Sequence, residues 1–169
     1  MAAIVTTASR PKLAALDTNI LFHLAEQYAP AHNLVLRLVR TGFMPVVVQT
    51  VVQELSDAVK NGDTQKKRES AAIALSSMLT WGIQPISLKP VGNGICEIAA
   101  NIIANRKLLP EEERNDAYIL TEAAVCNAHM LLTYDGHLLK ASNTDLNEVL
   151  TSLDLSAVQI LPPKAILGY

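Results

Sequence analysis

Four acidic side chains could do chemistry together. Asp17 and Asp135 each end a short apolar run, Asp116 stands where a polar run leads into an apolar helix, and Glu54 lies at the border of the apolar face of a helix. Carboxylates that meet in one cleft cannot all stay ionised, so they take up protons or bind cations. Oxygen ligands suit Mg²⁺ or Mn²⁺, and no group of cysteines and histidines has the spacing of a zinc site. Such ions activate water and hold a phosphodiester for in-line attack. The residue types therefore suggest metal-assisted phosphodiester hydrolysis, provided that the fold brings them together.

Short strands and helices that alternate along the chain must position these acids. Unbroken apolar runs at 13–16, 44–48 and 130–132 are typical of strands buried on both faces. Weaker strand candidates lie at 83–88, where Pro85 indicates an edge, and at 158–161. Apolar residues at helical spacing predict helices at 20–25, 30–41, 49–60, 65–81, 95–107, 117–127, 137–141 and 146–153. The glycines around Asn93 predict a loop at 92–94. Glu122, a polar residue in the otherwise apolar helix 117–127, is expected to reach solvent.

This alternation predicts an α/β fold with a central, mostly parallel sheet covered by helices on both faces. The whole chain, residues 1–169, is expected to form a single domain. Because right-handed crossovers place the carboxyl ends of parallel strands at one edge, Asp17 and Asp135 should leave the sheet side by side. Glu54, on the helix after the second strand, and Asp116, which precedes the strand of Asp135, should reach the same cleft.

Composition limits the functions that the chain can have. Half of the 169 residues are hydrophobic and the net charge is −2, which excludes a general basic field for nucleic acid. Binding to nucleic acid would need a local patch, for which Lys66, Lys67 and Arg68 are candidates, with Arg114 as a residue that could steer a phosphate. The sequence has no signal-peptide pattern and no apolar stretch that could span a bilayer, so the cytoplasm is expected.

Four short motifs resemble those of the PIN-domain nucleases, and within them the toxin nucleases of bacterial and archaeal toxin–antitoxin pairs. They are Leu-Asp-Thr-Asn at 16–19, Val-Val-Gln-Glu-Leu at 51–55, Asn-Asp-Ala-Tyr-Ile-Leu at 115–120 and Leu-Thr-Tyr-Asp at 132–135. The resemblance covers nearly the whole chain, and the segment from Asn61 to Leu109 departs from it most. It implies a three-layer α/β/α sandwich, Mg²⁺ or Mn²⁺, and cleavage of single-stranded RNA.

The resemblance also implies roles for neighbouring residues and for partners. Thr18 and Thr133 are expected to orient the carboxylates or water, and a homodimer with an antitoxin peptide is expected. Three alternatives stay open: a catalytically silent PIN-like module that binds RNA or protein, a housekeeping RNA-processing nuclease, and a signalling receiver domain. A receiver domain would have adjacent acids after its first strand, whereas this chain has one, Asp17.

Overall fold

The computed structural model describes residues 11–168 and contains a five-stranded sheet with the order β3-β2-β1-β4-β5. The strands are β1 (Lys12–Leu16), β2 (Phe43–Val47), β3 (Gln84–Pro85), β4 (Ala128–Leu132) and β5 (Gln159–Leu161). Every neighbouring pair is parallel. The predicted α/β fold is therefore confirmed, and Pro85 lies in an edge strand as expected.

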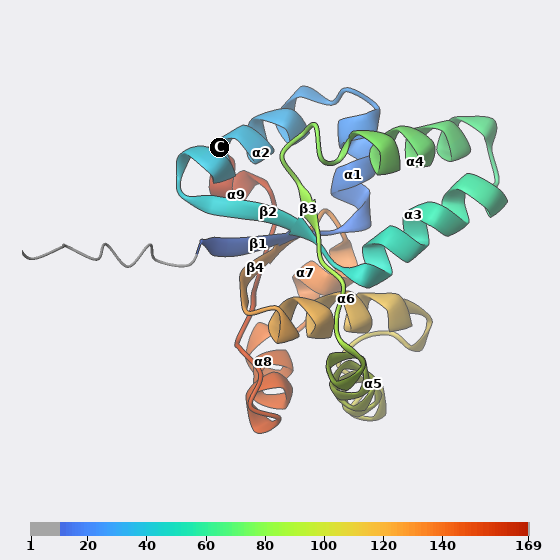
Figure 1. Ribbon diagram of the computed structural model, residues 1–169. Helices are drawn as coiled ribbons and strands as arrows, with labels where there is room; N and C mark the ends of the chain where they lie inside the picture. The colour runs from blue at the N-terminus through green and yellow to red at the C-terminus, as the bar shows by residue number, and fades with distance from the viewer. Residues whose placement is uncertain (1–10, 169) are drawn as a thin grey trace, which may run out of the picture.

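Helices cover the sheet on both faces and complete three layers (Figure 1). In that view α1, α2 and α4 lie above the sheet, whereas α5, α6 and α8 lie below it. Helix α3 packs against α4 of one layer and α6 of the other, and so it joins the two layers beside the sheet. The helices are α1 (Thr18–Ala25), α2 (Ala29–Arg40), α3 (Gln49–Asn61), α4 (Gln65–Ser77), α5 (Pro90–Asn105), the 3₁₀ helix η1 (Glu111–Glu113), α6 (Arg114–Val125), α7 (Gly136–Lys140), α8 (Asn143–Ser152) and α9 (Lys164–Leu167).

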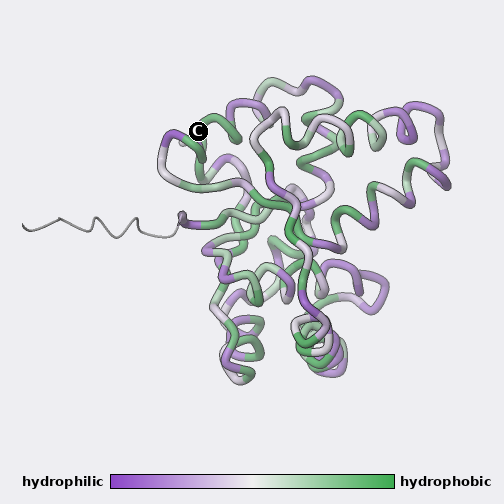
Figure 2. The backbone as a smooth tube through the Cα atoms, viewed as in Figure 1, coloured by the Kyte–Doolittle hydropathy of each residue, from purple (hydrophilic) through white to green (hydrophobic). Residues whose placement is uncertain are grey.

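The core lies on both faces of the central strands. Ala14, Ala15 and Leu16 of β1 are fully buried, as are Leu131 and Leu132 of β4. Figure 2 shows hydrophobic residues concentrated along these strands, whereas colours alternate along the helices. A strand buried on both faces has no polar alternation, which is why the run at 13–16 could be recognised in the sequence. Within residues 11–168, no helix combines the length and the apolar character needed to cross a membrane.

The prediction of a loop at residues 92–94 is wrong, because these residues belong to α5, which begins at Pro90. Proline suits the first turn of a helix, where its missing N–H is not needed. A Cβ on Gly92 would lie 3.3 Å from a methyl group of Val125 in α6, so the glycine allows α5 to approach α6 closely. Packing of α5 against α6 thus outweighs the poor helix propensity of glycine, which costs about 1 kcal/mol per residue.

Helix α4 is shorter than predicted, because it ends at Ser77 rather than near Trp81. The chain then turns, and Gly82 has φ +78°, a conformation that favours glycine. The short helix α9 was not predicted, because it follows two prolines and has too few residues to show a period.

Candidate functional site

Asp17 lies at the carboxyl end of β1, where its side chain caps α1. One carboxylate oxygen accepts the backbone N–H of Thr18 at 2.7 Å. The other accepts hydrogen bonds from the Asn19 amide at 2.7 Å and from the Thr133 hydroxyl at 2.5 Å. Because β1 and β4 are neighbours in the sheet, the loop after β4 brings Thr133 beside Asp17. Asp17 is thus both a helix cap, as the sequence allows, and a member of a buried polar cluster.

Asp135 follows β4 and lies at the same edge of the sheet. Its backbone N–H donates to the Thr133 hydroxyl at 2.8 Å. Its carboxylate accepts the backbone N–H groups of His137 at 2.7 Å and Leu138 at 3.0 Å, so it caps α7. The carboxylate of Asp135 is therefore fixed by the helix that it begins.

Glu54 connects three elements of the fold. One oxygen of its carboxylate accepts a hydrogen bond from the Thr18 hydroxyl, and the other accepts one from the Asn115 amide at 2.8 Å. Glu54 belongs to α3, Thr18 to α1 and Asn115 to α6. Asn19 and Asn115 were not predicted as site residues. The signal in the sequence was their position, because Asn19 directly follows Thr18 and Asn115 directly precedes Asp116.

Asp116 is 9% exposed, and its Oδ2 is buried without a hydrogen-bond partner. Burial raises the pKa of this carboxyl to about 8, and the negative charges of four other acids add to the effect: Asp17, Asp135, Glu113 and Glu54. Burial likewise raises the pKa of Asp17 to about 6, against the hydrogen bonds from Thr133 and Thr18. The four predicted acids therefore act on one another electrostatically at a single edge of the sheet.

A divalent cation fits the donor chemistry of this edge. The site offers carboxylate oxygens, an excess of negative charge and one buried oxygen without a partner. Within residues 11–168, however, no three His, Cys, Asp or Glu side chains are arranged as a ready set of metal ligands. Mg²⁺ does not need such a set, because it keeps several waters and is usually held by one or two carboxylates.

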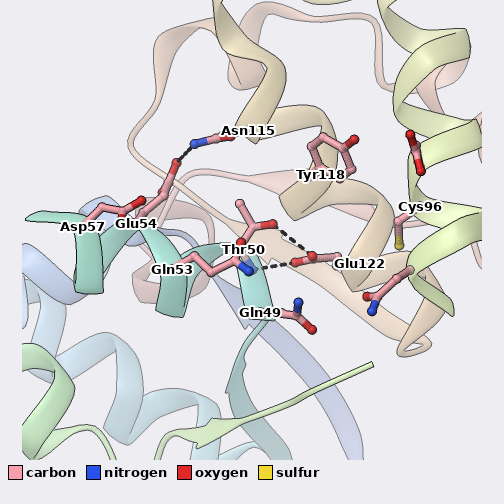
Figure 3. Close-up of a pocket in the computed structure, with 11 residues that line it drawn as sticks. Gln49, Thr50, Gln53, Glu54, Asp57, Cys96, Asn115, Tyr118 and Glu122 are labelled. Carbon is pink, nitrogen blue, oxygen red and sulfur yellow. Dashed lines mark hydrogen bonds between the residues drawn. The ribbon is translucent and has the colours of Figure 1, made fainter. Parts of the chain in front are cut away.

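The expectation that Glu122 reaches solvent is wrong, because this side chain is 4% exposed. Its two oxygens accept the backbone N–H and the hydroxyl of Thr50, each at 2.9 Å (Figure 3). Thr50 lies in the first turn of α3, and Val48, the residue at the cap position, has no side-chain acceptor. Glu122 of α6 thus caps α3 and fixes the helix of Glu54 against the helix of Asp116.

Two hollows adjoin Glu54. A cavity of about 450 Å³ lies between α3, α5 and α6 and includes Glu54 and Asn115 in its lining (Figure 3). A second hollow, of about 400 Å³, is lined by Glu54, Asn115, Thr18 and also Lys67. Glu54 and Asn115 therefore line both hollows.

The three basic residues of α4 each have a partner within the protein. Lys66 pairs with Glu26 at 3.1 Å and Lys67 with Asp63 at 3.6 Å, both at exposed positions. Arg68 donates to the backbone carbonyl of Gly62 at 2.5 Å. Exposed ion pairs are weak, so the two lysines can exchange these partners for phosphates.

Arg114, the residue predicted to steer a phosphate, is held by contacts with α5 and α6. Its guanidinium donates to the side chain of Asn101 at 2.8 Å and lies 5.7 Å from the centre of the Tyr118 ring. The contacts hold the side chain between α5 and α6.

Comparison with known proteins identifies the fold. Neither the protein-family models nor the curated proteins give a match to the sequence. Among solved structures, VapBC2 from Rickettsia felis, solved bound to a DNA fragment from its promoter, matches with a TM-score of 0.61 and 16% identity over 89% of this chain and 98% of that chain. VapBC-1 from nontypeable Haemophilus influenzae matches with a TM-score of 0.52 and 19% identity over 90% of this chain and 98% of that chain. The five-stranded parallel sheet and its helical layers are thus the PIN-like α/β/α fold of these structures, as the sequence motifs predicted.

Proposed function

We propose that this protein is a Mg²⁺- or Mn²⁺-dependent endoribonuclease that cleaves single-stranded RNA and acts as the toxin of a toxin–antitoxin pair. The observation that carries the proposal is the buried, unpartnered Oδ2 of Asp116 among three further acids of the same edge. A buried polar atom without a partner is costly, and a bound cation would satisfy it and balance the charge.

The fold supports the same class of function. The VapBC structures are toxin–antitoxin complexes, and VapC is a PIN-domain nuclease. We therefore expect a cytoplasmic protein that is restrained by an antitoxin and forms a homodimer. A catalytically silent module is disfavoured because all four acids are present at the edge.

In the proposed site Asp17 and Asp116 would hold the ion, and Glu54 and Asp135 would contribute to its binding directly or through water. The bound ion would lower the pKa of a water molecule and neutralise charge on the phosphate. Thr133 and Asn19 donate hydrogen bonds that keep the carboxylate of Asp17 in place. Such fixed carboxylates need little reorganisation when substrate arrives.

The RNA backbone is proposed to approach past Lys67, which lines the hollow beside Glu54. Lys66 and Arg68, on the same helix, extend this basic segment. Arg114, whose guanidinium is bonded to Asn101 of α5, would contact another phosphate. A local patch of this kind is needed because the net charge of the chain is −2.

Cleavage of a labelled single-stranded RNA by the purified protein tests the proposal. We expect cleavage with Mn²⁺ or Mg²⁺, none with EDTA, and a loss of about a thousandfold or more in Asp116→Ala. Asp154→Asn, a change at an exposed acid with φ +57°, serves as the matched control and should cleave normally. Equal cleavage by Asp116→Ala and wild type would show that the activity belongs to a contaminant or to another site.

Expression in cells distinguishes a toxin from a housekeeping nuclease. Wild type expressed alone should slow growth, Asp116→Ala should not, and a co-expressed antitoxin should restore growth. Harmless expression of an enzyme that cleaves RNA in the test tube would favour RNA processing instead.

A further inference from the structure

The cavity beside Glu54 has a lining unlike that of a phosphate site. Its walls come from α3, α5 and α6, and Figure 3 shows Gln53 and Asp57 on one side and Tyr118 on another. No lysine, arginine or histidine lines it, whereas four carboxylates do: Glu54, Asp57, Glu97 and Glu122. The remaining polar groups are mostly side-chain amides, among them Gln53 and Asn93. An anionic phosphate would be repelled here, so the occupant must be neutral or cationic and must donate hydrogen bonds.

The four carboxylates of the cavity differ in whether they already have hydrogen-bond partners. Glu54 and Glu122 already accept hydrogen bonds from Thr18, Asn115 and Thr50. Asp57 and Glu97 are exposed, and within residues 11–168 neither has an ion-pair or hydrogen-bond partner. They lie on different helices, α3 and α5, that face the same cavity.

We propose that this cavity binds a guanine base of the RNA, next to the phosphodiester that is cleaved. The inference rests on the proposed nuclease function and names its base preference. Guanine presents two adjacent donors, N1–H and the N2 amino group, on its Watson–Crick edge, and a carboxylate can accept both. Uracil presents one N–H between two carbonyl oxygens, which would face the carboxylates unfavourably. Bases of single-stranded RNA are commonly read through this edge beside an aromatic side chain, and Tyr118 supplies an aromatic surface here.

The position of the cavity gives the base a defined place in the substrate. Glu54 and Asn115 line the cavity and also belong to the acidic edge. The same two residues also line the hollow that contains Lys67. A single-stranded RNA that passes over Glu54 would thus place its phosphates near Lys67 and one base in the cavity. The amide of Gln53 or Asn93 could donate to guanine O6.

A pair of single-stranded RNAs tests the proposal. Both contain one central purine in a run of uridines, which is guanosine in one RNA and inosine in the other; inosine lacks only the N2 amino group. Wild type should cleave beside guanosine about 10- to 100-fold faster than beside inosine. In Glu97→Gln, Asp57→Asn or the double variant this ratio should fall toward one. Glu148→Gln, an exposed glutamate that pairs with Arg106 instead, is the control and should keep the full ratio.

Equal cleavage of the two RNAs by wild type would overturn the proposal, as would a ratio that survives in the double variant. Fluorescence anisotropy in EDTA separates this inference from the nuclease proposal, because it measures binding without cleavage. Tighter binding of the guanosine RNA, lost in the double variant, would support the base site even in a protein that cleaves nothing. Equal binding of both RNAs, with the double variant impaired only in binding a basic protein partner, would show that the cavity serves that partner instead.

Discussion

Asp116 and Glu122 are two buried acids on the same helix, six residues apart, and they differ in how their oxygens are satisfied. Both oxygens of Glu122 accept hydrogen bonds from Thr50, whereas Oδ2 of Asp116 has no partner. Burial raises the pKa of both carboxyls. The satisfied acid holds two helices together, and the unsatisfied one lies among other acids at the end of the sheet. Burial alone therefore does not distinguish the two acids; the presence or absence of a hydrogen-bond partner does.

The largest stability effect is expected at Glu122. Replacement by leucine would leave the buried N–H and hydroxyl of Thr50 without acceptors and remove the cap of α3, lowering the free energy of unfolding by about 2–4 kcal/mol. Glu122→Gln keeps one acceptor oxygen and should lose about half as much. Urea denaturation measures both. A loss below about 0.5 kcal/mol in Glu122→Leu would mean that Glu122 is not a structural acid.

The second largest effect is expected from Mn²⁺ binding, which should depend on Asp116 and not on Glu122. At a Mn²⁺ concentration of about 100 times Kd, a site present only in the folded protein stabilises it by about 2.7 kcal/mol. We expect this gain in wild type. We also expect it in Glu122→Gln, because Glu122 bonds to Thr50 and is not proposed to hold the ion. It should vanish in Asp116→Asn. Thermal unfolding monitored by circular dichroism, with and without Mn²⁺, gives the comparison, and an unchanged Tm in wild type would contradict a cation site.

The smallest effect is a dependence of stability on pH in the absence of metal. The pKa of Asp116 is about 8 in the folded protein and 3.8 ordinarily, and that of Asp17 is about 6. At a pH between the ordinary pKa of an acid and its raised pKa in the folded protein, the folded protein keeps a proton that the unfolded chain releases. The free energy of unfolding should therefore fall as the pH rises from about 4 to about 8. Asp116→Asn should flatten the upper part of this curve, from about pH 6 to about pH 8. Urea titrations in EDTA measure the free energy of unfolding at each pH across this range. A free energy of unfolding that rises with pH would mean that the folded protein favours the ionised acids.

Much of the fold followed from local pattern. The apolar run at 13–16 lies in β1, and the helix predicted at 49–60 begins at Gln49 in the structure. Pro85 lies in an edge strand as predicted. Strands and helices that alternate leave few arrangements, because parallel strands need helical crossovers of one hand. Asp17 and Asp135 could be placed at the same edge for this reason.

Other features depend on contacts between distant parts of the chain. Nothing near Glu122 in the sequence indicates that Thr50, seventy-two positions away, would take both of its oxygens. The helix through Gly92 forms because α5 packs closely on α6, against the local preference of its glycines. The cavity that Asp57 and Glu97 share exists only once α3 and α5 are assembled. The sequence by itself thus indicated most of the elements, and that Asp17 and Asp135 leave the sheet at one edge, since these follow from local periodicity and from the single hand of parallel crossovers. Tertiary structure decided which buried oxygens are satisfied, because hydrogen-bond partners and cavities arise from residues that meet only on folding.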